Sequence, residues 1–90
     1  MASKGWQFIF DKTADKQFAR LDKPIQRQII QATQKIINAP NPKALAKQLT
    51  GSKAQFWRYR IGTYRIIVRF EDMNLIILAV KIAHRKDVYK

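Results

Sequence analysis

Two apolar-rich runs on either side of Gly62-Thr63 form the clearest local pattern in the chain. Two linking residues with glycine first, between runs of strand-forming residues, are typical of a type II′ β-hairpin turn. This turn predicts the cross-strand pairs Ile61–Tyr64, Arg60–Arg65, Tyr59–Ile66, Arg58–Ile67, Trp57–Val68 and Phe56–Arg69. Residues 55–71 are therefore expected to form the central hairpin of the protein.

The alternation within this hairpin separates an apolar face from a basic one, because successive side chains of a strand point to opposite sides. The apolar face, expected to meet the core, carries Trp57, Tyr59, Ile61, Tyr64, Ile66, Val68 and Phe70. The basic face carries Arg58, Arg60, Arg65 and Arg69 around Phe56 and Ile67.

Arginines that face one another need an explanation, because like charges directly opposite destabilise a sheet by roughly 0.2–1 kcal/mol. Basic residues often only make an exposed face soluble, and lysine would serve that purpose as well. Guanidinium groups bind phosphate bidentately, however, and Glu71 at the margin is the one carboxylate near them. The basic face is therefore predicted to bind phosphate.

Before the hairpin, the pattern predicts one strand and two helices. Residues 6–10 are aromatic and β-branched, which favours a strand. Asp11 or Thr13 can cap a short helix whose apolar stripe ends near Leu21. A longer helix starts at residues 22–24, where proline is tolerated in the first turn, and stops before Pro40.

The remaining segments are a predicted third helix from Lys43 to about Leu49 and a last strand over 75–83. A three-residue turn at 72–74 would place Lys81 opposite Arg65. It would also put four side chains on the core face: Ile76, Leu78, Val80 and Ile82. The fold class is α+β in the order β-α-α-β-β-β, a small antiparallel sheet with the first strand at an edge and a helical hairpin on one face.

Length and charge limit the choice of function. Ninety residues make a single domain, 1–90, and the absence of cysteine excludes disulfides and thiolate chemistry. No apolar run is long enough for a membrane span, and we expect a cytoplasmic protein. Eighteen basic against six acidic residues give a net charge of +12, which attracts nucleic acid before anionic membrane or an acidic protein.

Little classical catalytic chemistry is available. The six carboxylates lack metal-ligand spacing, one histidine excludes a two-histidine ribonuclease, and no serine has the partners of a triad. No metal or other cofactor is expected. Basic and aromatic residues remain, and those expected to bind RNA are Lys53, Phe56, Arg69, Lys81 and Lys86.

The segment 84–90 adds two groups to this surface. His84 can exchange protons near neutral pH, although it is also an ordinary residue of a basic tail. Tyr89 can stack on a base, or it can pack on the core or fray with the terminus.

These residues resemble the RelE branch of the RelE/ParE toxin superfamily. The resemblance lies in Gly62-Thr63-Tyr64-Arg65, in the pair Arg58 and Arg60, and in the closing run from His84 to Tyr89. It implies a RelE-like fold and the toxin of a type II toxin–antitoxin pair. Such a toxin is a metal-independent endoribonuclease, an mRNA interferase, that cleaves messenger RNA in the ribosomal A site by attack of the substrate's own 2′-OH.

The resemblance also implies partners. A RelB-like antitoxin, through an acidic or amphipathic segment, would silence the toxin. The ribosome and mRNA would be its targets. Operator DNA would be contacted indirectly through the antitoxin, and no membrane is involved.

The roles of the site residues follow from the same resemblance. Arg65 would hold the scissile phosphate, Arg85 would support the leaving 5′-oxygen, and Tyr89 would orient a nucleotide. Arg58 and Arg60 stand where relatives have lysines that assist the base. Because arginine keeps its proton at neutral pH, the base is open: His84 or Lys81 could replace it, or the arginines could act by electrostatics alone.

Two other functions fit the sequence. A ParE-like toxin would inhibit DNA gyrase and would not be a nuclease. A plain RNA- or DNA-binding module would use the basic face for affinity without cleavage.

Overall fold

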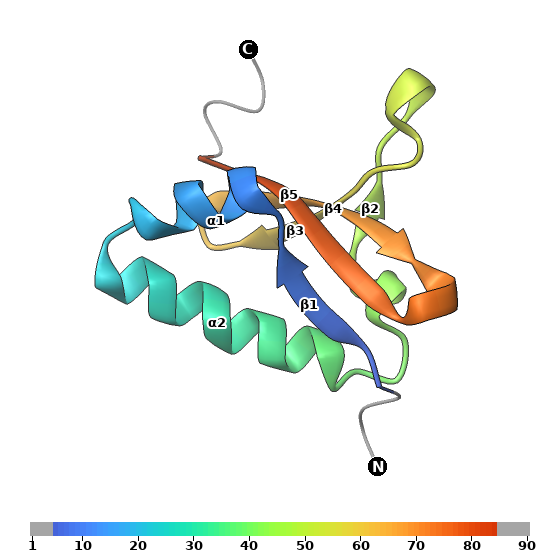
Figure 1. The fold of residues 1–90 in the computed structure, drawn as a ribbon, viewed down its shortest axis with the longest axis horizontal. Helices are drawn as coiled ribbons and strands as arrows, with labels where there is room; N and C mark the ends of the chain where they lie inside the picture. The colour runs from blue at the N-terminus through green and yellow to red at the C-terminus, as the bar shows by residue number, and fades with distance from the viewer. Residues whose placement is uncertain (1–4, 85–90) are drawn as a thin grey trace.

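The computed structural model describes residues 5–84, and it has the predicted α+β architecture (Figure 1). Strand β1 and two helices come first, followed by two short 3-10 turns around strand β2, and then by three longer strands. The elements are β1 (Gln7–Phe10), α1 (Lys12–Ala19), α2 (Lys23–Ile37), η1 (Pro42–Leu45), β2 (Lys47–Gln48), η2 (Gly51–Lys53), β3 (Trp57–Ile61), β4 (Tyr64–Glu71), η3 (Asp72–Asn74) and β5 (Ile76–His84). The predicted element order is confirmed, with β2 as an additional strand.

The five strands form one sheet in the order β1-β5-β4-β3-β2. The pairs within β2 to β5 are antiparallel, but β1 runs parallel to β5, with Gln7 beside Ile76 and Phe10 beside Ala79. The predicted edge position of the first strand is confirmed, whereas an all-antiparallel sheet is wrong. Hydrophobic alternation is the same for both directions, so the pattern could not distinguish them.

The helices cover one face of the sheet and enclose the core. Asp11 caps α1 as predicted, because its side chain accepts a hydrogen bond of 2.9 Å from the Ala14 backbone N–H. Neither described helix is long and apolar enough to cross a membrane. The buried core residues come from both helices and from one sheet face: Ala14, Ile29, Ile36, Tyr59, Ile61, Ile66, Val68, Ile77, Ala79 and Ile82.

The central hairpin confirms five predicted pairs, from Ile61–Tyr64 to Trp57–Val68. Gly62 has the positive φ, 60°, that the predicted turn requires at its first position. The ladder does not extend to Phe56–Arg69, because the Phe56 backbone bonds instead to Lys53 and Leu49.

Strand β5 differs from the predicted register at two points. Leu75, in the left-handed conformation, lengthens the predicted three-residue turn by one residue, so Ile77 and Ala79 are buried in place of Ile76, Leu78 and Val80. A bulge beside Ile67 and Val68 then shifts the register again, so that the side chains of β5 beyond it point to the predicted sides of the sheet. Ile82 is therefore buried as expected. Lys81 consequently lies opposite Ile67, whereas Arg65 lies opposite Ala83.

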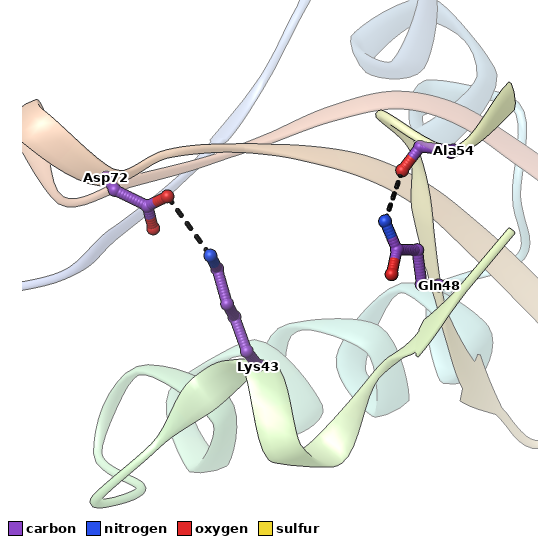
Figure 2. A network of polar contacts seen from close by, with 4 residues as sticks. All are labelled: Lys43, Gln48, Ala54 and Asp72. Carbon is purple, nitrogen blue, oxygen red and sulfur yellow. Dashed lines mark hydrogen bonds and ion pairs between the residues drawn. The ribbon is translucent and has the colours of Figure 1, made fainter.

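The predicted third helix is wrong beyond its first turn. Pro42–Leu45 is a single 3-10 turn, and Lys47–Gln48 pairs with β3 as a short edge strand. The buried Tyr59 hydroxyl donates a 2.8 Å hydrogen bond to the Pro42 carbonyl. Figure 2 shows two further attachments: Lys43 Nζ lies 3.0 Å from Asp72 Oδ2, and Gln48 Nε2 donates to the Ala54 carbonyl at 2.7 Å.

Two glycines permit a matched test of the hairpin turn. A Cβ at Gly62 would lie 2.8 Å from Gln28 Nε2 of α2, whereas a Cβ at Gly51, which has a similar φ of 66°, would meet nothing within 4 Å. We expect Gly51→Ala to destabilise the protein by about 1 kcal/mol through backbone strain alone. Gly62→Ala should destabilise it slightly more, because the end of the flexible Gln28 side chain must move, and the excess should disappear when Gly62→Ala is combined with Gln28→Ala. Urea unfolding of the two single glycine variants, of Gln28→Ala and of the double variant measures this, and an excess that persists in the double variant would contradict the contact with α2.

The Tyr59–Pro42 hydrogen bond gives a prediction in alkaline solution. Burial raises the pKa of Tyr59 well above its usual range, so the native state keeps the proton after the unfolded chain loses it near about pH 10. Stability from this group is complete below that pH and falls as pH rises. Tyr59→Phe should cost about 1–2 kcal/mol at pH 8, and the difference from wild type should shrink between about pH 10 and 11. A difference that stays constant in urea unfolding over this range would contradict the assignment.

Candidate functional site

The sheet face that points away from the helices, here called the outer face, gathers the basic side chains in two rows. The row nearest the Gly62 turn runs Arg60–Arg65–Ala83 across β3, β4 and β5. The next row runs Lys47–Arg58–Ile67–Lys81 across β2 to β5. With strands about 4.8 Å apart, the second row spans about 14 Å. Three cations and one apolar residue thus cross the sheet in a line beside the arginine pair.

Arg65 differs from its neighbours on the outer face in being almost completely buried, with 4% of its surface exposed. Arg60, directly opposite, is exposed, and Arg58 is half-buried. Withdrawing a guanidinium from water is expensive, and its position on β4 fixes it in place. The outer face therefore holds one buried cation, with an exposed and a half-buried arginine beside it.

Like charges meet directly at two places on this face. Arg60 faces Arg65, and Lys47 faces Arg58. Glu71, the acidic residue at the margin, is paired with Arg69 at 3.4 Å, and both side chains are partly exposed. The arginine and lysine pairs are therefore arranged to favour a bound anion over the empty face.

Two shallow depressions adjoin one another on this surface, and Arg60 lines both. The first, of about 120 Å³, lies at the hairpin turn and is lined by Arg60, Gly62, Thr63, Tyr64 and Arg65. The second, of about 290 Å³, lies toward the edge strand and is lined by Leu45, Ala46, Lys47, Arg58 and Arg60. A chain of linked anions could contact both depressions at once.

The structure brings together five of the residues that the sequence nominated. Arg58, Arg60, Arg65, Arg69 and Lys81 all lie on the outer face.

Five other nominated residues lie elsewhere or outside the described chain. Lys53 is exposed in η2, beyond the end of β3 that is remote from Gly62, so it does not join Arg65. Phe56 is half-buried beside it and is not paired with Arg69, contrary to the prediction. Arg85, Lys86 and Tyr89 lie outside the described residues.

His84 lies on the other side of the sheet from Arg65. It pairs with Tyr64, and their rings meet edge to face with centroids 5.2 Å apart. Tyr64 belongs to the face that packs on the core. The sequence placed His84 near the basic surface as a possible base; in the structure its side chain lies on the Tyr64 side of β5, and Tyr64 also lines the depression at the hairpin turn.

Two residues of the second depression, Leu45 and Lys47, were missed by the sequence reasoning. Both were assigned to the third helix, which hid their position beside Arg58. The sequence offered no clear signal, because Lys47-Gln48-Leu49-Thr50 before Gly51 contains a single apolar residue and shows no alternation. Within residues 5–84, no three acidic or histidine side chains gather as a metal site would require.

The fold is that of solved toxins from toxin–antitoxin complexes. The RelBE2 complex from Mycobacterium tuberculosis contains a chain with a TM-score of 0.80 and 22% identity, over 90% of this chain and 99% of that one. The archaeal RelE–RelB complex from Pyrococcus horikoshii OT3 gives 0.69 and 21%, over 90% and 96%. A YoeB/ParE toxin from Agrobacterium tumefaciens gives 0.67 and 13%, over 87% and 96%. These likenesses establish the RelE-like fold.

The sequence itself matches a family model over nearly its whole length. Comparison with curated protein sequences gave no match. Residues 8–89 match the model described as the ParE toxin of the type II toxin–antitoxin system parDE. The chain therefore belongs to the ParE toxin family of type II toxin–antitoxin systems, within the RelE/ParE superfamily.

Proposed function

We propose that this toxin is a ribosome-dependent mRNA endonuclease, an enzyme that cleaves messenger RNA in the ribosomal A site. One observation carries the proposal: the nearly buried Arg65 lies directly opposite Arg60 on a face crowded with cations. Inhibition by binding a protein does not require a fixed guanidinium beside a small depression. Stabilising a phosphate as its charge increases does require one.

The proposed reaction is an internal transesterification. The 2′-oxygen of the substrate bonds to phosphorus, the bond from phosphorus to the 5′-oxygen breaks, and a 2′,3′-cyclic phosphate and a 5′-hydroxyl result. Arg65 holds the phosphate in the first depression, while Arg60 and Arg58 stabilise the pentavalent phosphorane. By resemblance, Arg85 would support the leaving oxygen and Tyr89 would orient the nucleotide.

We assign the arginines an electrostatic role and do not assign His84 as the base. The strand register supports this choice, because His84 pairs with Tyr64 on the core side of β5. Arginine is a poor proton acceptor but a strong stabiliser of an oxyanion. The 2′-OH proton is then lost to solvent, solvent water supplies the proton that the leaving 5′-oxygen takes up, and the bound ribosome completes the alignment.

Inhibition of DNA gyrase is the second candidate, and the family match favours it, since the matching model is that of ParE toxins. A non-catalytic RNA- or DNA-binding module would be a third. A binding module would use the outer face for phosphate contacts, and a gyrase inhibitor would use its surface to bind a protein. The Arg60–Arg65 pair is best explained by cleavage.

Arg65→Met is the sharpest test, because methionine keeps much of the side-chain volume and removes the charge. We expect ribosome-dependent cleavage to fall by about 10²-fold or more, with thermal unfolding at or above the wild-type midpoint. Arg27→Met, which removes an exposed arginine from α2, is the matched control and should cleave normally. His84→Ala should stay near the wild-type rate.

The measurement is primer extension on ribosomes programmed with a defined A-site codon. Codon-dependent cuts by the wild type support cleavage, whereas inhibited supercoiling without cuts supports the gyrase candidate. An equally folded Arg65→Met variant that cleaves at full rate would remove Arg65 from the site. A hundredfold loss in His84→Ala, with ribosome binding unchanged, would restore the histidine as a base.

We further propose that a RelB-like antitoxin silences the toxin through an acidic or amphipathic segment across the outer face, and that operator DNA is contacted through that antitoxin. RelE toxins are found with RelB in solved complexes. The complex should weaken as NaCl rises from 0.1 to about 1 M, because salt screens exposed charges. Calorimetry with the toxin and with Lys81→Ala measures this. A salt-independent affinity that Lys81→Ala leaves unchanged would contradict neutralisation of this face.

A further inference from the structure

The second depression has features of a binding site and is not accounted for by the cleaved phosphate. It adjoins the first depression at Arg60 and extends toward the sheet edge, where Lys47 and Leu45 form its far side. Leu45 has 55% of its surface exposed, a large fraction for an apolar side chain. A cationic edge next to an exposed aliphatic side chain matches the two parts of a nucleotide, a phosphate and a base.

The charges in this depression also favour an anion. Lys47 lies directly opposite Arg58, the second like-charge pair on the outer face. Each such pair destabilises an empty sheet. An edge strand of two residues would be more stable without this pair. A phosphate bound between the two side chains would offset their repulsion.

The wall that carries Leu45 and Lys47 is held in place from three sides. The Pro42 carbonyl accepts a hydrogen bond from the buried Tyr59 hydroxyl. Lys43 Nζ forms an ion pair with Asp72 Oδ2 at 3.0 Å. Lys47 and Gln48 pair with β3, and Gln48 is also bonded to Ala54 (Figure 2). A wall fixed in this way is already positioned before RNA arrives, which limits the entropy lost on binding.

From this arrangement we infer a second RNA subsite, which holds the nucleotide next to the cleaved phosphate. Lys47 and Arg58 bind its phosphate, and Leu45 packs against its base. The inference rests on the proposed function in one respect, that the outer face receives RNA. It adds Leu45 of η1 and Lys47 of β2 to the site. It also predicts that the contribution of Lys47 to RNA affinity depends on salt and that the contribution of Leu45 does not.

The probe is a fluorescein-labelled 2′-O-methyl RNA hexanucleotide, which lacks the nucleophile and cannot be cleaved. Its binding to the full-length toxin is measured by anisotropy between 50 and 400 mM NaCl. Lys47→Ala should weaken binding about fivefold at 100 mM and lower the slope of log affinity against log salt by about 0.7, the value for one single-strand phosphate contact. Leu45→Ser should weaken binding with no change of slope.

Two further variants make the result specific. Lys35→Ala removes one exposed lysine from α2 and should bind as wild type, and Lys47→Arg should restore the salt slope. Lys47→Ala with the affinity and slope of Lys35→Ala would overturn the subsite, as would a wild type that fails to bind the probe at 50 mM NaCl. Neither result depends on ribosomal cleavage. A wild type that binds the probe as expected but cuts no mRNA would count against the proposed function alone.

Discussion

The pairing of β3 with β4 positions the residues of the site. Its core face stabilises the pairing by burying apolar side chains, and its outer face destabilises it by bringing like charges together. On the core side, Ile66 and Val68 are fully buried. Each such side chain contributes about 1.5–3 kcal/mol. On the outer side the same register brings Arg60 against Arg65, which opposes pairing by roughly 0.2–1 kcal/mol. The core face therefore decides the register, and the arginines are held together by residues on the opposite face of the sheet.

The rest of the site depends on elements attached to this hairpin. Gln28 of α2 lies so close to Gly62 that a Cβ there would meet it, and the Tyr59 hydroxyl of β3 donates a hydrogen bond to the Pro42 carbonyl. Lys43 lies 5.4 Å from the centre of the Phe70 ring while it pairs with Asp72, so one side chain joins η1 to the end of β4 and to the start of the turn that follows. Regular structure, and not a long loop, therefore positions most of the described cations, as precise positioning of a catalytic group requires.

Local patterns were sufficient wherever one residue fixed the geometry. Gly62 determined the turn and five cross-strand pairs, and Asp11 determined the start of α1. The sequence was insufficient where a single residue shifts a strand: Leu75 and the bulge at Ile67 and Val68 each reverse the facing of β5. Leu45 and Lys47 were missed because β2, which contains Lys47 and starts two residues after Leu45, has two residues, too few for alternation to appear. The direction of β1 depends on a partner that no local pattern identifies.

The parallel pairing of β1 with β5 also has a consequence for biosynthesis. Gln7 lies beside Ile76, so nearly all of the described chain separates the two partners. During translation β1 leaves the ribosome early but must wait for β5 before its apolar side chains are covered. Non-local pairing of this kind forms slowly. Lys81 and the backbone opposite Arg65 arrive with that same strand. The outer face therefore becomes complete only after β5 has been synthesised.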